Sequence, residues 1–511
     1  MIKIVSYRGH IRNWASLCDE LSIDKELSRK DREEAILMKA YKKWHGDMAK
    51  HIHGMYAFAL WDDEREELFA LRDPFGTKPF YYYVTEEGSL LYGTMIRDIM
   101  KDASFKKELN EELLQIYMSL TYVPGEDTLF KGVKKLLPGS YMIWKKGKLK
   151  IERYFEPTFI PDESKSLEEW ADEIHSTVKD IFKEIKTEDE YVMSFLSGGV
   201  DSSYVLAMSD ADMSASCGYE EERFDVSVLA KATADLLGRG NNRCLITPEE
   251  YFDIVPYVMY NMEQPLGDAS AIAFALGCKK TAESTKICYS GEGADEFFGG
   301  YNMYRNAERY GDNLKTFYVG NTNIMKEDEK QRLLKNYKEG FLPIDLVKDK
   351  YDSMEGLDPL SKMSAIDIQI WLEGDIYLNV DKMSEAAGLE VRMPLTDMRI
   401  FDIAKAMPSK YKINAEHNKV ALRTAAAKVL PEEIAFRKKL GFIVPIRVWM
   451  ADDRYNGDVK RRILSDTADK FFNLDEVKTI WDEYVTVNSD NWRKIWTIYT
   501  FVVWYDEYFG K

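Results

Sequence analysis

The sequence predicts a mixed α/β fold in two domains, a sheet-rich domain over residues 1–156 and a larger domain with a parallel sheet over residues 166–511. The length of 511 residues exceeds that of one ordinary domain. Strand-like runs and turns dominate the first part of the chain, whereas short apolar strands alternate with longer helices after Ser166. That alternation is typical of a parallel sheet covered by helices. The stretch 157–165, which contains Pro, Asp and Ser, is the predicted linker.

The amino-terminal domain is expected to contain one early helix followed by strands. Apolar side chains recur at helical spacing between Lys30 and Lys50, which predicts an amphipathic helix there. Strands are predicted where apolar and aromatic runs lie between turn residues such as Asp73-Pro74-Phe75-Gly76. They cover residues 55–61, 67–72 and 79–84, and a hairpin of 140–144 with 149–154.

The second domain is expected to start its sheet with the apolar strand 191–196, which leads into a helix over 204–208. The end of the chain, after about residue 450, predicts packed helices. Aromatic side chains dominate buried area, so those in this stretch are expected to form core rather than a ligand cage. They include Trp481, Trp492, Trp496, Trp504 and Tyr508.

Composition and charge exclude several classes of protein. Lysine and arginine number 70 against 87 aspartates and glutamates, and the resulting net charge of −17 repels nucleic-acid backbones. No apolar run is long enough for a membrane span, and the start of the chain lacks a signal-peptide pattern. The five cysteines contain no CxxC pair, so neither a disulfide framework nor a four-cysteine zinc site is predicted. We therefore expect a reducing, cytoplasmic location and no nucleic-acid or membrane partner.

The strongest local feature is the loop Ser197-Gly198-Gly199-Val200-Asp201-Ser202-Ser203, between the predicted strand and helix. Two glycines let the backbone approach a phosphate, and the start of the helix offers N–H groups and the positive end of its dipole. The serine hydroxyls add donors, and Asp201 is an oxygen ligand suited to Mg²⁺. The loop lacks the lysine of a Walker A motif, which disfavours transfer of a γ-phosphate. A glycine-rich turn without a ligand is the structural alternative.

Further segments make the pattern specific. Tyr289-Ser290-Gly291-Glu292-Gly293-Ala294-Asp295 is a second strand-to-turn element rich in glycine and carboxylate, and segments 381–397, 419–423 and 436–442 follow it. The first loop matches the SGGxDS pyrophosphate loop of ATP pyrophosphatases, which cleave ATP between its α and β phosphates. In order and spacing, the whole set resembles the synthetase domain of glutamine-hydrolysing asparagine synthetases and of their relatives, the β-lactam and carbapenam synthetases. The resemblance extends over most of residues 1–450.

This resemblance implies a fold and a set of ligand contacts. The fold would be an Ntn-glutaminase-like α+β sandwich, truncated, followed by a doubly wound parallel α/β domain of the ATP-pyrophosphatase type with extra carboxyl-terminal helices. ATP and Mg²⁺ are the implied cofactors, and Asp201 and Asp295 would hold the metal. The pyrophosphate would be held by Ser197, Gly198, Gly199, Ser202 and Ser203, and the adenosine by Leu196, Cys217, Gly218, Ser290 and Gly291.

Two catalytic residues are implied as well. Glu292 matches a glutamate near the acyl-adenylate of asparagine synthetases, where β-lactam synthetases have a tyrosine. A carboxylate there can take a proton from the attacking nitrogen, although Glu292 could instead cap the next helix. Lys439 matches a late lysine placed to stabilise negative charge on AMP or on the tetrahedral oxyanion, and Lys438 competes for this role.

The implied substrate residues come from two regions. Asp268 and Ser270 lie in the segment that matches the acceptor site of the family. Asp381, Glu390 and Arg392 would form a buried, ion-paired floor of the pocket, with either a purely structural role or direct contact with substrate.

The amino-terminal domain is expected to lack glutaminase activity. Glutamine-using members of the family place a cysteine directly after the initiator methionine, and its thiol attacks the glutamine amide. Ile2 stands at that position here, and Cys18 is internal without a free α-amine. Arg8, His10 and Arg32 match the family's glutamine-binding Asn, Glu and Asp. Cations and a titratable ring would thus replace acidic groups that bind the ammonium of glutamine.

The implied function is an ATP-dependent ligase that forms a carbon–nitrogen bond. A carboxylate, by default aspartate, would be adenylated with release of pyrophosphate, and ammonia or an amine would then displace AMP. An amide, lactam or peptide ligase of specialised metabolism is one alternative, and a non-catalytic nucleotide-binding homologue is another. A sulfur-transferring enzyme is disfavoured because the sequence has no paired cysteine motif. The expected partners are small molecules, together with a second copy of the chain or a separate amine-donating protein.

Overall fold

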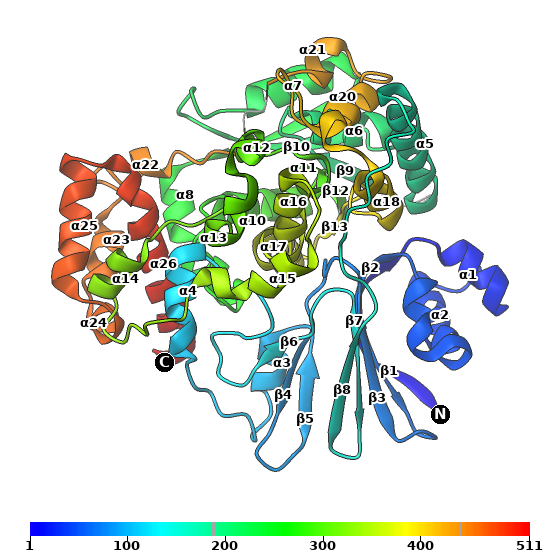
Figure 1. Cartoon of the computed structure of the whole chain (residues 1–511), viewed down its shortest axis with the longest axis horizontal. Helices are drawn as coiled ribbons and strands as arrows, with labels where there is room; N and C mark the ends of the chain where they lie inside the picture. The colour runs from blue at the N-terminus through cyan, green and yellow to red at the C-terminus, as the bar shows by residue number, and fades with distance from the viewer. Residues whose placement is uncertain (187–190, 439–440, 511) are drawn as a thin grey trace.

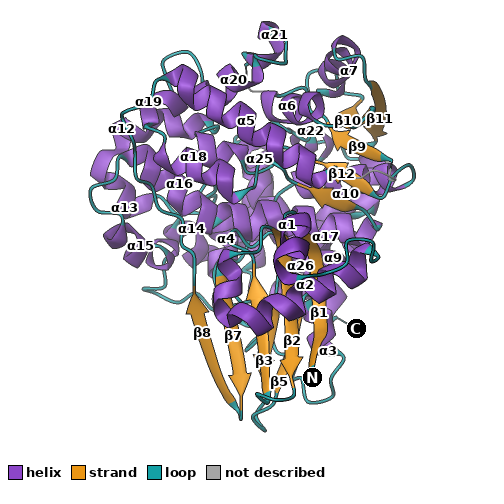
Figure 2. Cartoon of the chain, turned by 90° about the vertical axis from the view of Figure 1, so that its right-hand side faces the viewer, coloured by secondary structure: helices purple, strands orange, loops and turns teal. Residues whose placement is uncertain are grey.

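A computed structural model describes residues 1–186, 191–438 and 441–510 of the chain. The sheet-rich amino-terminal domain lies below a larger, helix-rich domain (Figure 1). In the turned view, the long strands of the first domain extend away from the helical body (Figure 2). The mixed α/β fold class predicted from the sequence is confirmed, with a sheet domain first and a parallel-sheet domain second.

The main sheet of the amino-terminal domain has five antiparallel strands in the order β1-β2-β3-β7-β8. Helices α1 (Trp14–Leu21) and α2 (Arg29–Trp44) pack on one face of this sheet, and a smaller sheet packs on the other. The strands of the main sheet are β1 (Ile2–Ile11), β2 (Gly54–Asp62), β3 (Glu67–Arg72), β7 (Ser140–Lys145) and β8 (Lys148–Arg153). Those of the smaller sheet are β5 (Leu90–Gly93), β4 (Tyr81–Val84) and β6 (Lys134–Lys135). Strand β1 and helix α1 lie outside the predicted elements.

The second domain is built on five parallel strands in the order β11-β10-β9-β12-β13. They are β9 (Val192–Phe195), β10 (Met213–Tyr219), β11 (Gly240–Ile246), β12 (Ile287–Tyr289) and β13 (Glu390–Arg392). The chain builds outward from β9 to one edge, and then returns to place β12 on the other side of β9. Open α/β sheets bind their ligands at such a switch point, outside the carboxyl ends of the strands. Both predicted glycine loops start there, after β9 and after β12.

Many short helices surround the parallel sheet. Helix α3 (Ile96–Met100) instead packs on β4 and β5 of the smaller sheet, and α4 (Leu114–Leu120) contacts the last helix, Trp492–Phe509. The helices of the second domain before β12 are α5 (Leu167–Ile185), α6 (Val200–Met208), α7 (Ser227–Leu236), α8 (Pro248–Asp253), α9 (Val255–Met262) and α10 (Ser270–Ala282). Those after β12 are α11 (Ala294–Phe298), α12 (Ala307–Tyr310), α13 (Leu314–Phe317), α14 (Glu327–Leu333), α15 (Lys348–Ser353), α16 (Pro359–Gln369) and α17 (Leu378–Ala387). A π-helical segment, Leu372–Tyr377, joins the last two helices. After β13 come α18 (Met398–Ala406), α19 (Ser409–Lys412), α20 (Val420–Ala426), α21 (Glu432–Ala435) and α22 (Ile446–Trp449).

The chain ends in the packed helices that the sequence predicts. They are α23 (Gly457–Ile463), α24 (Asp466–Phe471), α25 (Leu474–Thr486) and α26 (Trp492–Phe509). Trp496 and Trp504 of α26 are completely buried, and the indole of Trp504 donates to the carbonyl of Glu263 at 3.0 Å. These aromatic side chains are therefore core, as predicted. Within the described residues, no helix is sufficiently long and apolar to span a bilayer.

Several buried ion pairs cross the interface between the two domains, and their basic partner lies in the first domain. Arg12 Nη1 lies 2.7 Å from Asp397 Oδ2, and both side chains are almost fully buried. Arg8 and Lys78 both contact Asp381 Oδ1, at 3.0 and 2.9 Å. Burial acts to raise the pKa of Asp381, but the positive charges of Arg8 and Lys78 lower it below its ordinary value. The interface is therefore held by buried, charge-paired groups.

Candidate active site

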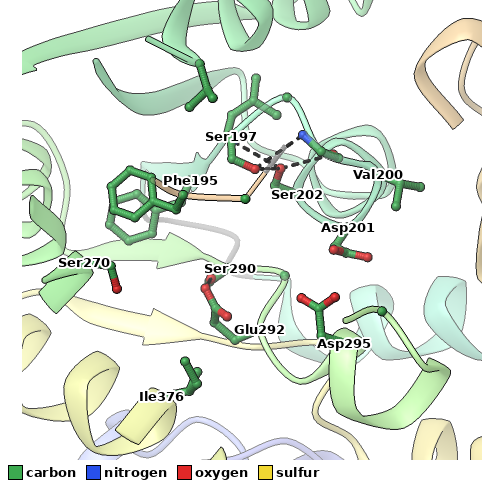
Figure 3. Close-up of a pocket in the computed structure, with 18 of the residues that line it drawn as sticks. Phe195, Ser197, Val200, Asp201, Ser202, Ser270, Ser290, Glu292, Asp295 and Ile376 are labelled. Atoms are coloured by element: carbon green, nitrogen blue, oxygen red, sulfur yellow. Dashed lines mark hydrogen bonds between the residues drawn. The ribbon is translucent and has the colours of Figure 1, made fainter. Parts of the chain in front are cut away.

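A cavity of about 420 Å³ opens at the switch point of the parallel sheet. The loops after β9 and β12 form two of its walls, and Ser270 and Ile376 approach from the side of the second loop (Figure 3). The π-helical segment contributes Ile376 to the wall. Irregular helical turns of this kind occur often at functional sites.

The first loop has the geometry of an anion site. Gly198 adopts φ +76°, a left-handed conformation that favours glycine. The hydroxyl oxygens of Ser197 and Ser202 lie 3.1 Å apart, and the backbone N–H of Gly199 donates to Ser197 Oγ at 3.4 Å. These groups lie beside the first turn of α6 and line the cavity (Figure 3). Ser203 differs, because it is completely buried and donates to the carbonyl of Gly199 at 2.7 Å. Ser203 therefore stabilises the loop through its backbone and is not part of the cavity wall.

The two predicted metal ligands face each other across the site. Lys419 Nζ lies 2.7 Å from Asp201 Oδ2 and 2.7 Å from Asp295 Oδ1. Burial acts to lower the pKa of Lys419, but the charges of Asp201 and Asp295 raise it, so the ammonium stays charged. Gly300 makes this approach possible, since a Cβ there would lie 2.0 Å from Lys419 Cε and 1.8 Å from Asp295 Oδ1.

The carboxylate pair suits a hard cation. Among the described residues, no hydrogen-bond donor reaches Asp201 Oδ1, a buried oxygen. Carboxylate oxygens are the ligands that Mg²⁺ prefers, and Mg²⁺ is typically bound by one or two of them together with phosphate oxygens. Asp201 and Asp295 therefore fit Mg²⁺, provided that a ligand supplies the remaining oxygens.

Lys419 has no role predicted from the sequence, although it belongs to the segment 419–423 that matches the family pattern. Lys419 stands 218 residues from Asp201 in the chain, so their contact has no local signal. Its backbone adopts φ 58° and ψ 38° at the start of α20. Left-handed conformations of residues other than glycine carry strain and cluster at functional sites. Lys419 is thus a candidate functional residue that only the three-dimensional structure identifies.

Two arginines fasten the first loop to the late segment of the chain. Arg437 Nη1 donates to the carbonyl of Gly198 at 2.7 Å and to Thr233 Oγ1 at 3.1 Å. Arg423 Nη1 in turn donates to the carbonyls of Ala435 and Arg437, at 2.7 and 2.9 Å. The glycine loop is therefore held in place by guanidinium groups from more than 200 residues further along.

The opposite end of the cavity is apolar and contains some of the residues predicted to contact adenosine. The rings of Phe195 and Phe274 lie 5.3 Å apart, and Leu196 and Cys217 line the same wall. Ser290 and Gly291 also line the cavity, but Gly291 lies beside Asp201, where a Cβ would be 3.0 Å from the Asp201 backbone. Gly218 is placed differently, because its Cα faces Ser227 and Asp225, where a Cβ would lie 2.3 Å from Ser227 Oγ.

Glu292 lines the cavity beside the second loop (Figure 3). The hydroxyl of Ser290 lies 3.5 Å from Glu292 Oε1, and Thr396 Oγ1 donates to the carbonyl of Glu292 at 3.0 Å. The N-cap of α11 is Gly293 rather than Glu292, which weakens the helix-cap alternative. Close by, burial raises the pKa of Glu296 to about 8, with a further contribution from the charge of Asp295.

The predicted acceptor residues also reach the cavity. Asp268 and Ser270 line it, and the backbone N–H of Ser270 donates to Asp268 Oδ1 at 2.9 Å. Burial raises the pKa of Asp268, and hydrogen bonds from Ser270 oppose this effect. Lys439 lies outside the described residues, whereas its neighbour Lys438 lines the cavity.

Asp381, Glu390 and Arg392 are ion-paired as predicted, and Asp381 and Glu390 have further partners in the amino-terminal domain. Glu390 accepts a fork of two hydrogen bonds from Arg29, at 2.7 and 3.1 Å, and a third from Arg392 at 2.7 Å. Asp381 pairs with Arg8 and Lys78, as described above. Within the described part of the chain, none of the three belongs to the cavity wall. The geometry therefore favours a structural role for these three residues over contact with a substrate in the cavity. Their charged groups are already paired at or beside the domain interface.

The residues at the predicted glutamine-binding positions also have partners within the protein. His10 is buried, with Nδ1 3.6 Å from Glu390 Oε1. Burial, followed by the positive charge of Arg392, holds the pKa of His10 well below its ordinary value, so the ring is neutral. Arg32 stacks on the ring of Trp14 at 3.8 Å and lies apart from Arg8 and His10.

Comparison with known proteins identifies both parts of the chain. The family model described as asparagine synthase matches residues 173–506. The chain belongs to the asparagine synthase family. This family suggests ATP-dependent amide ligation, and a second model, described as glutamine amidotransferase domain, matches residues 2–155.

Three relatives show the range of similarity within and around the asparagine synthase family. Asparagine synthetase [glutamine-hydrolyzing] 1 of Bacillus subtilis (strain 168) is 33% identical over 98% of this chain and 85% of its own length. Asparagine synthetase [glutamine-hydrolyzing] 3 of the same organism is 27% identical over 85% of this chain and 74% of its own length. The amidase chry2 of Gibberella zeae is 30% identical over 57% of this chain and 46% of its own length.

Proposed function

We propose that this chain is an ATP-dependent ligase that adenylates a carboxylate, releases pyrophosphate, and lets ammonia or an amine displace AMP. The observation that carries the proposal is the convergence of the two glycine loops at one cavity. The loops place Asp201 and Asp295 in ion pairs with Lys419 at one end of the cavity. Glu292 and Asp268 line the same cavity. A nucleotide and an acceptor can therefore meet in a single site.

The nucleotide would lie along the loop that follows β9. Ser197, Ser202 and the N–H groups at the start of α6 would bind phosphate oxygens, and the apolar wall at Phe195 and Cys217 would receive the adenine. Asp201 and Asp295 would hold Mg²⁺, which when bound neutralises negative charge on the phosphates. Lys419 keeps the two carboxylates close together and adds positive charge beside them.

The acceptor would lie near Glu292, Asp268 and Ser270. Aminolysis requires a group that takes a proton from the attacking nitrogen, and Glu292 is the carboxylate that we assign to this step. Negative charge develops on the oxygen of the tetrahedral intermediate and on the leaving AMP, and a lysine beside the cavity would stabilise it. Lys438 and Lys439 are the candidates, as the sequence predicts.

The nitrogen would come from ammonia or an amine rather than from glutamine hydrolysed by this chain. Arg8 places a cation where the resemblance expects a glutamine-binding side chain, and it is committed to Asp381. His10 is neutral and buried against Glu390. Neither residue offers a negative charge for the ammonium group of glutamine.

A pyrophosphate-release assay tests the proposal. The purified chain, with ATP and Mg²⁺, would be tested against a panel of carboxylates that includes aspartate, each with ammonium or with amines. Asp201→Ala is expected to abolish pyrophosphate formation. Glu292→Gln is expected to retain carboxylate-dependent exchange of pyrophosphate into ATP and to lose amide formation. Unchanged amide formation in Glu292→Gln would show that Glu292 is not the base.

The nitrogen source needs its own comparison. We expect ammonium to support turnover and glutamine to fail at the same concentration, with amide product measured by mass spectrometry. Equal rates with glutamine and ammonium would contradict the absence of glutaminase activity, and would leave the ligase assignment intact.

A further inference from the structure

We propose that Cys217 and Cys244 form a reversible dithiol–disulfide pair at the apolar end of the cavity, and that oxidation of this pair weakens nucleotide binding. The inference rests on the proposed function to the extent that the cavity binds ATP. It assigns a modification site to two residues of neighbouring strands.

Strand register places the two cysteines side by side. Cys217 of β10 and Cys244 of β11 are directly paired in the parallel sheet. Paired residues of parallel strands point to the same face, with a strand spacing of about 4.8 Å, and a disulfide needs a Cα separation of about 4.4–6.8 Å. Both thiols are free, and each influences the pKa of the other. A disulfide can therefore form without rearrangement of the strands.

The surroundings separate this pair from the other thiols. Cys217 and Cys244 are half-buried, whereas Cys18, Cys278 and Cys288 are buried. All five cysteines of the chain lie within the described residues. Gly277 of α10 leaves space over Cys217, since a Cβ there would lie 2.7 Å from the sulfur. Exposure and proximity to a second thiol thus coincide at this pair.

Cys244 is the first of the two thiols to react. The hydrogen bond from Cys217 lowers the pKa of Cys244, burial opposes this effect, and the charge of Lys280 assists it. With hydrogen peroxide as the oxidant, the Cys244 thiolate attacks one oxygen and gives a sulfenic acid and one water. The Cys217 sulfur then attacks the Cys244 sulfur and displaces the second water. Each sulfur gives up one electron in total, and the two electrons reduce one peroxide.

The bond would change the wall that receives the nucleotide. Cys217 lines the cavity with Phe195 and Phe274, whereas Cys244 is absent from the described cavity wall. A disulfide brings the two sulfurs to about 2.0 Å, and so draws Cys217 toward β11 and away from the cavity. The loss of one fitted contact in an apolar pocket typically weakens binding about tenfold.

The test compares the reduced and the peroxide-treated full-length chain. Peptide mapping is expected to show a cross-link between Cys217 and Cys244 with a loss of two hydrogen atoms. Titration with Mg²⁺-ATP is expected to show an increase of about tenfold in Kd, which dithiothreitol reverses. Cys244→Ser should bind ATP as the reduced wild type does and show no response to peroxide. Cys18→Ser, a matched control in the other domain, should respond as the wild type does.

Two results would overturn the inference. One is the absence of the Cys217–Cys244 cross-link after peroxide treatment, and the other is a cross-link that leaves the Kd for ATP unchanged. If the reduced chain binds no ATP at all, the proposed function fails together with the claim about binding, and the peptide map still decides the disulfide separately.

Discussion

At the scale of the residue, the ammonium group of Lys419 is the centre of the site. Two carboxylates this close together would repel each other without a cation between them. Lys419 supplies that cation, at 2.7 Å from each side, and Gly300 provides the space for it. The backbone of Lys419 is left-handed, a strained conformation for a residue other than glycine.

We expect Lys419→Met to lower kcat/KM for pyrophosphate formation by about 100-fold or more, because a preorganised charge at the reacting phosphates is lost. The pyrophosphate-release assay measures this change. Lys183→Met is the control, since it removes an exposed lysine that pairs with Asp180 on the surface of α5. Equal activity of Lys419→Met and Lys183→Met would remove Lys419 from the site.

Asp367 of α16 provides a prediction about pH. It is completely buried and accepts hydrogen bonds from Tyr304 and Tyr318 at 2.5 and 2.6 Å. Burial raises its pKa from 3.8 to about 7, and the tyrosine hydroxyls act in the opposite direction. A group whose pKa is raised on folding contributes stability below its unfolded pKa, and this contribution is lost as the pH rises through its folded pKa.

We therefore expect the thermal stability of Asp367→Asn to increase relative to that of the wild type as the pH rises from about 4 to about 7. Above pH about 7, this difference should stay constant. The amide cannot ionise, and its oxygen can still accept from both tyrosines. Thermal melts across this pH range measure the difference. Asp402→Asn, at an exposed ion pair with Lys405, should show no such trend. A difference in thermal midpoint between Asp367→Asn and the wild type that does not change with pH would contradict the raised pKa of Asp367.

At the scale of the element, the loop after β9 depends on a distant segment for its position. Arg437 fixes the Gly198 carbonyl, and Arg423 fixes the backbone of Arg437. Arg437→Met should raise KM for ATP by about tenfold, because a charge-assisted hydrogen bond to the loop is worth about 1.5–3 kcal/mol. Steady-state kinetics with varied ATP measure the effect. Arg454→Met, at an exposed arginine that pairs with Asp452, should leave KM unchanged.

Elements whose signals are local could be predicted from the sequence. The strand–loop–helix unit around Gly198, the hairpin of β7 and β8, and the final helices all have clear periodicity or turn residues. Strand β1 was missed because its pattern is interrupted by polar residues such as Arg8 and His10, whose partners lie in the other domain. The cavity residues of the two loops were predicted, whereas Lys419 was not, because its role depends on contacts far along the chain.

The predicted floor of the pocket shows the same limit. Asp381 and Glu390 were correctly expected to form ion pairs, but sequence alone could not identify Arg8 and Arg29 as their partners. Such pairing is decided by how the two domains pack. Likewise, a serine of the first glycine loop can face the cavity, as Ser202 does, or its own helix, as Ser203 does.

At the scale of the whole molecule, buried ion pairs join the two domains. Arg12→Met would remove the interdomain cation of Asp397 and leave Arg399 as its remaining positive partner, so we expect a cost below the ~3–5 kcal/mol typical of a fully broken buried pair. We expect a clear fall in the thermal midpoint by calorimetry. Arg65→Met removes a more exposed arginine, which pairs with Asp62 within the first domain, and should have little effect. A midpoint for Arg12→Met equal to that of Arg65→Met would show that the pair contributes little.

In the buried interdomain ion pairs, the first domain supplies the basic groups and the second domain the acidic groups. This division limits which domains of related proteins can be exchanged. A chimera that takes its front half from a relative with a glutamate at the position of His10 would set like charges against Glu390. The two carboxylates would thus repel each other across the domain interface, even if each domain folded correctly. Engineering across this boundary must transplant both faces together.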